Sequence, residues 1–149
     1  MTEPLRLDVP VACPVEHAFD VWAHRIDAWW PRDHSASGDP FATVVLEPRV
    51  GGRIYERTSE GEEYEWGEVT GWEPPRRLAY RWHLRSDPES ATDVEIRFVA
   101  DGSATRVEIE HKGWERLGDT ADAWRDRNRA GWTTLLPHFV TAAEGGDDG

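Results

Sequence analysis

Apolar and polar residues alternate along the first segment and much of the middle of the chain, which is the pattern of half-buried β-strands. Leu5, Leu7, Val9 and Val11 form the first such run. From residue 41 to residue 112, short alternating or β-branched runs are separated by turn residues. These runs predict strands at Thr43–Glu47, Arg53–Arg57, Tyr64–Trp72, Leu78–Trp82, Val94–Phe98 and Val107–His111. Strands that follow one another through short turns predict an antiparallel sheet.

Two other segments repeat their apolar residues at helical spacing. The first follows Pro14 and reaches Ile26. The second runs from Asp119 to Ala143, and one of its faces holds Trp124, Asn128, Gly131, Trp132, Leu135, Leu136, Phe139 and Ala143. The pattern predicts an α+β fold, with a curved antiparallel sheet of about seven strands wrapped on a long C-terminal helix and short helices after the first strand. We expect residues 1–143 to form a single domain and residues 144–149 to be an acidic, disordered tail.

The net charge of the chain indicates which classes of binding partner can be excluded. The chain has 149 residues, 29 of them acidic and 17 basic, for a formal net charge of −12. Such a field repels phosphate backbones and anionic lipid head groups, so we expect no nucleic-acid partner and no membrane partner. The one cysteine, Cys13, excludes an internal disulfide and is expected to be a small structural thiol in a cytoplasmic protein.

The chain has nine tryptophans. Tryptophan is an unfavourable residue for simply filling a core, because a buried indole N–H needs a hydrogen-bond partner. Period-2 alternation puts every second residue of the Tyr64–Trp72 strand on one face, Trp66 and Glu68 among them. The next strand and the long helix are expected to bring more apolar side chains against that face. The indole of Trp30 is expected near one end of the same face. The predicted ligand-binding residues are Trp30, Trp66, Glu68, Tyr80, Trp82, Trp132 and Leu136. The alternative is an aromatic core without a hole.

The polar candidates each carry a second interpretation. Glu68 could orient a ligand or serve as a general acid or base, or its side chain could point to water. His83 and His111 could titrate inside a cavity, but a strand-edge histidine bonded to water is the favoured interpretation of each. His17 and His24 lie two helical turns apart, too far to share one ion, and neither a metal nor a cofactor is predicted.

Several short segments, taken in order, resemble a known family. They are Pro14–Phe19, Trp29–Pro31, Pro48–Arg53, Gly67–Val69, Trp72–Leu78, Thr105–Val107, His111–Trp114, Gly131–Trp132 and Leu135–Leu136. The set resembles the START-like, birch-pollen-allergen superfamily (SRPBCC), and within it the branch named for the activator of the heat-shock-protein ATPase. The resemblance implies the helix-grip fold and a cavity for apolar small molecules. It carries no single catalytic signature.

These observations favour a binding protein for a small apolar or aromatic molecule, held between the sheet and the C-terminal helix. One alternative is an enzyme of hydrolase or cyclase type that uses the same cavity, with Glu68 or a histidine as acid or base. Another is a chaperone-partner module that acts through its sheet surface. The sequence leaves a homodimer open.

Overall fold

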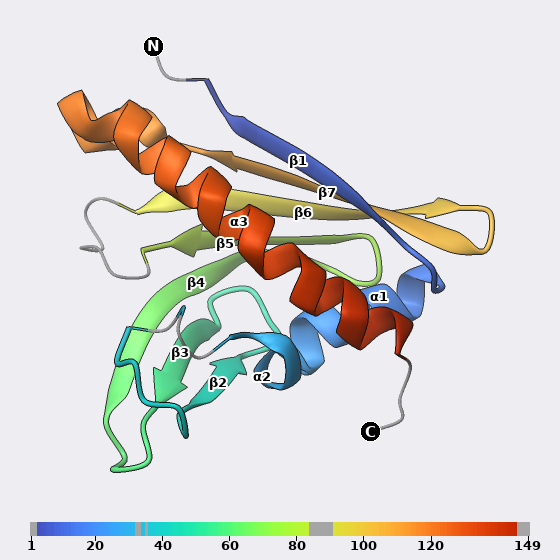
Figure 1. Cartoon of the computed structure of the whole chain (residues 1–149), viewed down its shortest axis with the longest axis horizontal. Coiled ribbons are helices and arrows are strands. Elements are labelled where there is room, and N and C mark those ends of the chain that lie inside the picture. Colours follow the sequence, from blue (N-terminus) through green and yellow to red (C-terminus); the bar gives the residue numbers. More distant parts are fainter. Residues whose placement is uncertain (1–2, 32–33, 35, 84–90, 146–149) are drawn as a thin grey trace.

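The computed structural model describes residues 3–31, 34, 36–83 and 91–145 (Figure 1). The strands form one seven-stranded sheet in the order β1-β7-β6-β5-β4-β3-β2, with every neighbouring pair antiparallel. The strands are β1 (Leu5–Val11), β2 (Thr43–Leu46), β3 (Arg53–Arg57), β4 (Glu63–Glu73), β5 (Arg77–Trp82), β6 (Thr92–Asp101) and β7 (Ala104–Lys112). The predicted α+β class, strand number and antiparallel arrangement are confirmed.

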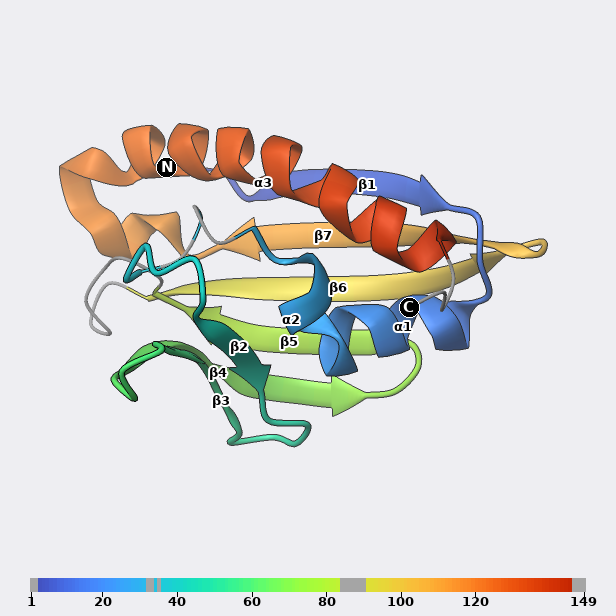
Figure 2. The ribbon, with the colours of Figure 1, turned by 60° about the horizontal axis from the view of Figure 1, so that its bottom comes forward.

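The helices all lie against one face of this sheet (Figure 2). After β1 come α1 (Val15–His24) and α2 (Ile26–Trp29), and after β7 come the 3-10 helix η3 (Trp114–Thr120) and the long α3 (Ala121–Glu144). The 3-10 turn was not predicted. Glu144, which the sequence pattern assigns to the tail, is the last residue of α3, and its carboxylate accepts the Ala12 N–H at 2.9 Å. The rest of the predicted tail, except Gly145, lies outside the described residues.

The space between the C-terminal half of α3 and the sheet is filled with aromatic rings. Trp22 contacts Phe139 at 4.8 Å and Trp29 at 5.0 Å between ring centroids, and Phe19 contacts Phe98 at 5.2 Å. All five side chains are buried. Edge-on and tilted pairs at these distances are the favourable arrangements of aromatic rings. This half of the molecule is therefore a packed core.

No helix within the described residues is long and apolar enough to cross a bilayer. The thiol of Cys13 is buried, and burial followed by the nearby Glu144 carboxylate raises its pKa. A raised pKa keeps a thiol protonated and unreactive at neutral pH.

Candidate functional site

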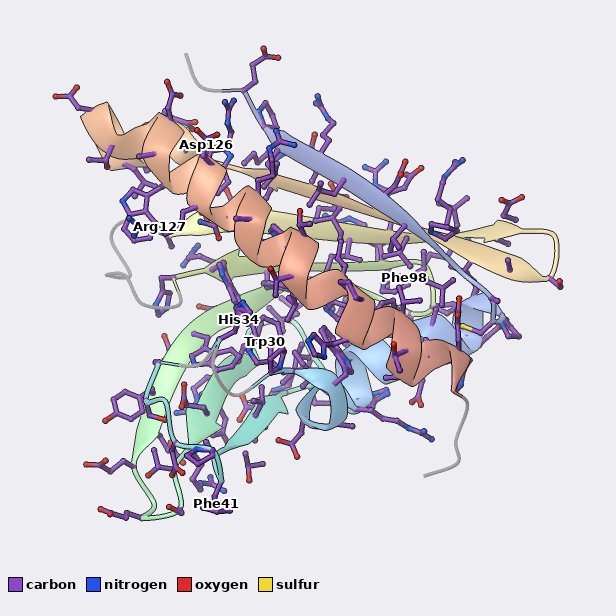
Figure 3. All side chains as sticks on the ribbon, viewed as in Figure 1. Trp30, His34, Phe41, Phe98, Asp126 and Arg127 are labelled. Atoms are coloured by element: carbon purple, nitrogen blue, oxygen red, sulfur yellow. The ribbon has the colours of Figure 1, made fainter. Side chains whose placement is uncertain are left out.

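A pocket of about 350 Å³ opens between the N-terminal half of α3 and the indoles of Trp30 and Trp82. This volume lies near the lower end of the range of about 300–1,000 Å³ that is usual for small-molecule sites. The pocket is lined by Trp30, His34, Trp82, Trp124, Arg127, Asn128, Gly131, Trp132 and Leu135. Figure 3 shows Trp30 and His34 beside the middle of α3, and Arg127 on the first half of that helix.

The six α3 residues of the lining follow from the helical repeat. Each of the residues 124, 127, 128, 131, 132 and 135 has another member of the set three or four positions away, which places them on one side of a helix. Gly131 lies in the middle of this side, and a Cβ added there would meet no atom within 4 Å outside the helix itself. The absent side chain at Gly131 therefore leaves room in the pocket.

A cluster of three indoles lies opposite α3, and two of them form the pocket wall on that side. The ring of Trp30 lies 5.0 Å from that of Trp66 and 5.7 Å from that of Trp82, and Trp66 and Trp82 are 5.8 Å apart. Trp30 follows α2, and its Nε1–H donates to the carbonyl of His34 at 3.2 Å. Trp82 ends β5, where it reaches the pocket, whereas Trp66 is fully buried behind the wall. The surface that faces the pocket on this side is thus formed by Trp30 and Trp82.

The buried carboxylate of Glu56 holds this wall in place. It accepts the Nε1–H of Trp66 at 2.8 Å and the backbone N–H groups of Ala36 and Ser37 at 2.5 and 3.2 Å. The Ser37 hydroxyl donates to the same carboxylate. A buried charge is tolerated only when hydrogen bonds replace its hydration. Glu56 therefore ties the segment after α2 to β3 and sets Trp66 against Trp30.

A second buried group, His111, connects the two sides of the pocket. Trp132 Nε1–H donates to His111 Nδ1 at 3.1 Å, so Nδ1 carries no proton and Nε2 carries it. His111 Nε2 lies 2.6 Å from the Thr92 hydroxyl oxygen. The same hydroxyl donates to the backbone carbonyl of Trp82 at 3.4 Å. This chain runs from the α3 wall at Trp132 to the β5 wall at Trp82. Burial lowers the pKa of His111 to about 3, so the imidazole is neutral at physiological pH.

The expectation of water-bonded, strand-edge histidines is wrong for both candidates. His111 is fully buried in β7, which has β1 and β6 on either side. His83, just after β5, is also buried, and its Nε2 lies 3.4 Å from a carboxylate oxygen of Glu65. Neither residue lines the pocket.

The placement of Glu68 on the inner face is also wrong. Its side chain is 50% exposed and lies 4.0 Å from the Arg81 guanidinium. The cause is a register shift of β4 against β3 between Glu65 and Gly67, where β4 carries one extra residue just before Glu68. The extra residue reverses the alternation of side chains. Val69, rather than Glu68, is therefore the buried residue that follows Trp66 and Gly67.

The remaining predicted site residues divide into two groups. Trp30, Trp82 and Trp132 line the pocket, whereas Trp66, Tyr80 and Leu136 are buried without lining it. Burial raises the pKa of the Tyr80 phenol above its usual range, so it stays protonated. The residues missed at the site are His34, Trp124, Arg127, Asn128, Gly131 and Leu135. Four of them belong to the helix face that the apolar spacing had identified, so the signal was present for Trp124, Asn128, Gly131 and Leu135.

A larger hollow, of about 440 Å³, lies on β1, β7 and β6 on the face turned away from α3. Four of its charged residues form ion pairs with each other, with Arg6 2.9 Å from Glu110 and Arg97 3.2 Å from Glu95. Among the residues that the structure describes, no three acidic, histidine or cysteine side chains gather as a metal site. The pocket under α3 is therefore the candidate site.

A seven-stranded antiparallel sheet that grips a long C-terminal helix, with an indole-lined pocket between them, defines a helix-grip α+β protein. Residues 12–144 match the family described as "Activator of Hsp90 ATPase homolog 1-like protein". The chain belongs to this family, which confirms the resemblance found in its sequence.

Solved structures extend the comparison. The chain is 40% identical to the anthrahydroquino-gamma-pyrone synthase Txn09, solved in complex with SUM, over 80% of this chain and 82% of that one, with a TM-score of 0.59. It is 31% identical to the self-sacrificing resistance protein CalC from Micromonospora echinospora, over 97% and 96% of the two chains, with a TM-score of 0.75. Protein MLL2253 from Mesorhizobium loti is 18% identical over 97% and 99%, with a TM-score of 0.73, and supports the fold alone. No curated protein matches.

Proposed function

We propose that this protein binds a small, planar aromatic molecule in the pocket between α3 and the Trp30 and Trp82 side chains. The observation that carries the proposal is that four indoles, those of Trp30, Trp82, Trp124 and Trp132, line one pocket. Indole rings give a flat aromatic ligand large contact areas and offset-stacked or edge-on ring contacts. The name of the relative Txn09, a synthase of an aromatic pyrone, agrees with a ligand of this kind.

The pocket walls are held before a ligand arrives. The Glu56 hydrogen bonds position the Trp66 and Trp30 side, and the His111 chain positions Trp132 relative to Trp82. Rings that are already ordered lose little conformational entropy on binding, so more of the contact energy appears as affinity.

Titration with 2-naphthamide, a neutral bicyclic probe, tests this function. We expect saturable binding of one molecule per chain, a change in tryptophan emission and a rise in melting temperature. At a probe concentration of 100 times the dissociation constant, the free energy of unfolding should rise by about 2.7 kcal/mol, because the probe binds only the folded chain. If bicyclic and tricyclic aromatic probes change neither emission nor melting temperature, the binding function is wrong and the chaperone-partner hypothesis takes its place.

Turnover in the same pocket is the second candidate, favoured by the synthase name of the 40% identical relative. With Glu68 on the outer face and His111 neutral and outside the lining, the acid or base in this hypothesis is His34, the one histidine among the described residues of the lining. Mass spectrometry of a molecule that is recovered with the purified protein, and is then incubated with the protein again, distinguishes the two functions. Binding leaves its mass unchanged on renewed incubation, whereas turnover converts it, and His34→Gln should then abolish the conversion.

A further inference from the structure

Among the residues that the structure describes, the pocket combines aromatic walls with one fixed positive charge. In a chain of net charge −12, none of these described lining residues is acidic, and Arg127 is the one among them that is always charged. The Arg127 guanidinium carbon lies 4.7 Å from the centroid of the Trp124 ring. A guanidinium held over an aromatic ring by this cation–π contact keeps N–H donors for other partners, because it carries five of them.

The neighbouring charges leave Arg127 available. Within the described part of the chain, the ion pairs of this helix include Arg125 with Asp126 at 3.8 Å, but none joins a carboxylate to Arg127. Most arginines on the sheet, by contrast, form ion pairs with carboxylates. Arg77, for example, contacts both Glu73 and Glu95. An arginine that is stacked on an indole but lacks a carboxylate partner can form charge-assisted hydrogen bonds to an incoming anion.

We infer that the pocket selects planar aromatic molecules that carry an anionic oxygen group, with the ring between the indoles and the anion at Arg127. This inference rests on the proposed function and names its ligand class. Arg127 is a specificity-determining residue in this arrangement. Since Arg127 is an exposed residue at the edge of the pocket, water and salt screen its attraction, and the preference should be moderate.

A matched pair of ligands tests the inference. 2-Naphthoate and 2-naphthamide have nearly the same shape and differ in charge. We expect the wild-type protein to bind the carboxylate about 5- to 10-fold more tightly than the amide at low salt, the range for a hydrogen-bonded charge at a partly exposed site. The preference should shrink when salt is raised, because added ions screen an exposed charge pair.

Two arginine substitutions on the same helix provide the control. Arg127→Gln should bring the ratio of the two affinities to about 1, since the charged donor is lost. Arg129→Gln removes the same charge from an exposed position outside the pocket lining and should keep the wild-type ratio. If both probes bind with equal affinity to the wild type, or if the preference survives in Arg127→Gln, the inference is wrong and the binding function stands. If neither probe binds to the wild type, both are wrong.

Discussion

Gly131→Leu is expected to block the pocket while the protein stays folded. A side chain at this position meets no neighbour within 4 Å at its Cβ, and helical side chains lean toward the N-terminus, here toward Arg127 and Asn128. The leucine therefore enters the space that the ligand needs. Forcing a ligand past it costs about 1–3 kcal/mol in strain, so binding of 2-naphthamide should weaken by about 5- to 160-fold. Isothermal titration calorimetry measures the loss.

Gly131→Ala is the control for this variant. It adds one methyl group and removes a mid-helix glycine, so the free energy of unfolding should rise by about 0.5–1 kcal/mol. Binding of the probe should persist, because most of the pocket stays open. If Gly131→Leu binds 2-naphthamide as tightly as the wild type does, the ligand does not occupy this pocket.

Acid should destabilise the protein through His111, and His111→Gln should remove that effect. Burial holds the pKa of His111 at about 3 in the folded chain, whereas an unfolded histidine titrates near about 6.5. Between these values the unfolded chain binds more protons, so stability falls as the pH falls from 6.5 toward 3. This one group contributes a slope of about 1.4 kcal/mol per pH unit.

The measurement is urea unfolding of the wild type and His111→Gln between pH 7.5 and pH 4.5. A glutamine can still accept from Trp132 and donate to Thr92, so the variant keeps partners for both groups. The difference in free energy of unfolding between the two proteins should change by about 2.7 kcal/mol between pH 7.5 and pH 4.5, in favour of the variant at acid pH. His138→Gln, on an exposed position of α3, is the matched control and should follow the wild type. Parallel pH profiles for wild type and His111→Gln would show that His111 is not held neutral.

Most of the fold could be predicted from the sequence, because each element carries its own local period. The alternation in Leu5–Val11 and the helical spacing from Trp124 to Ala143 both correspond to real elements, β1 and α3. The 3-10 helix at Trp114–Thr120 was missed. Its seven residues are too few to show a helical repeat of apolar residues.

The site was predictable only in part, because its geometry depends on pairing between distant segments. Period and analogy with the fold pointed to Trp30, Trp82 and Trp132, which do line the pocket, and their role in binding stays a prediction. Glu68 was misplaced, since a bulge is set by how β4 pairs with β3 and leaves little mark on the local pattern. For the same reason Glu56 was missed, and His111 was named as a candidate but interpreted as bonded to water. A polar residue in an alternating strand is read as exposed unless its partners, here Trp66 and Trp132, are known.

The central claim, that an aromatic ligand sits between α3 and the Trp30 and Trp82 indoles, is tested most directly by the indole N–H signals of the nine tryptophans. These signals can be followed in a ¹H–¹⁵N NMR spectrum during titration with 2-naphthoate, after assignment by single Trp→Phe substitutions. The ring current of a bound naphthalene should shift the signals of Trp30, Trp82, Trp124 and Trp132, which line the pocket. Trp72, which packs on Phe19 beside α1, and Trp114, beside His111, should move little. Shifts confined to Trp72, or no shift at any indole at saturating ligand, would contradict the account.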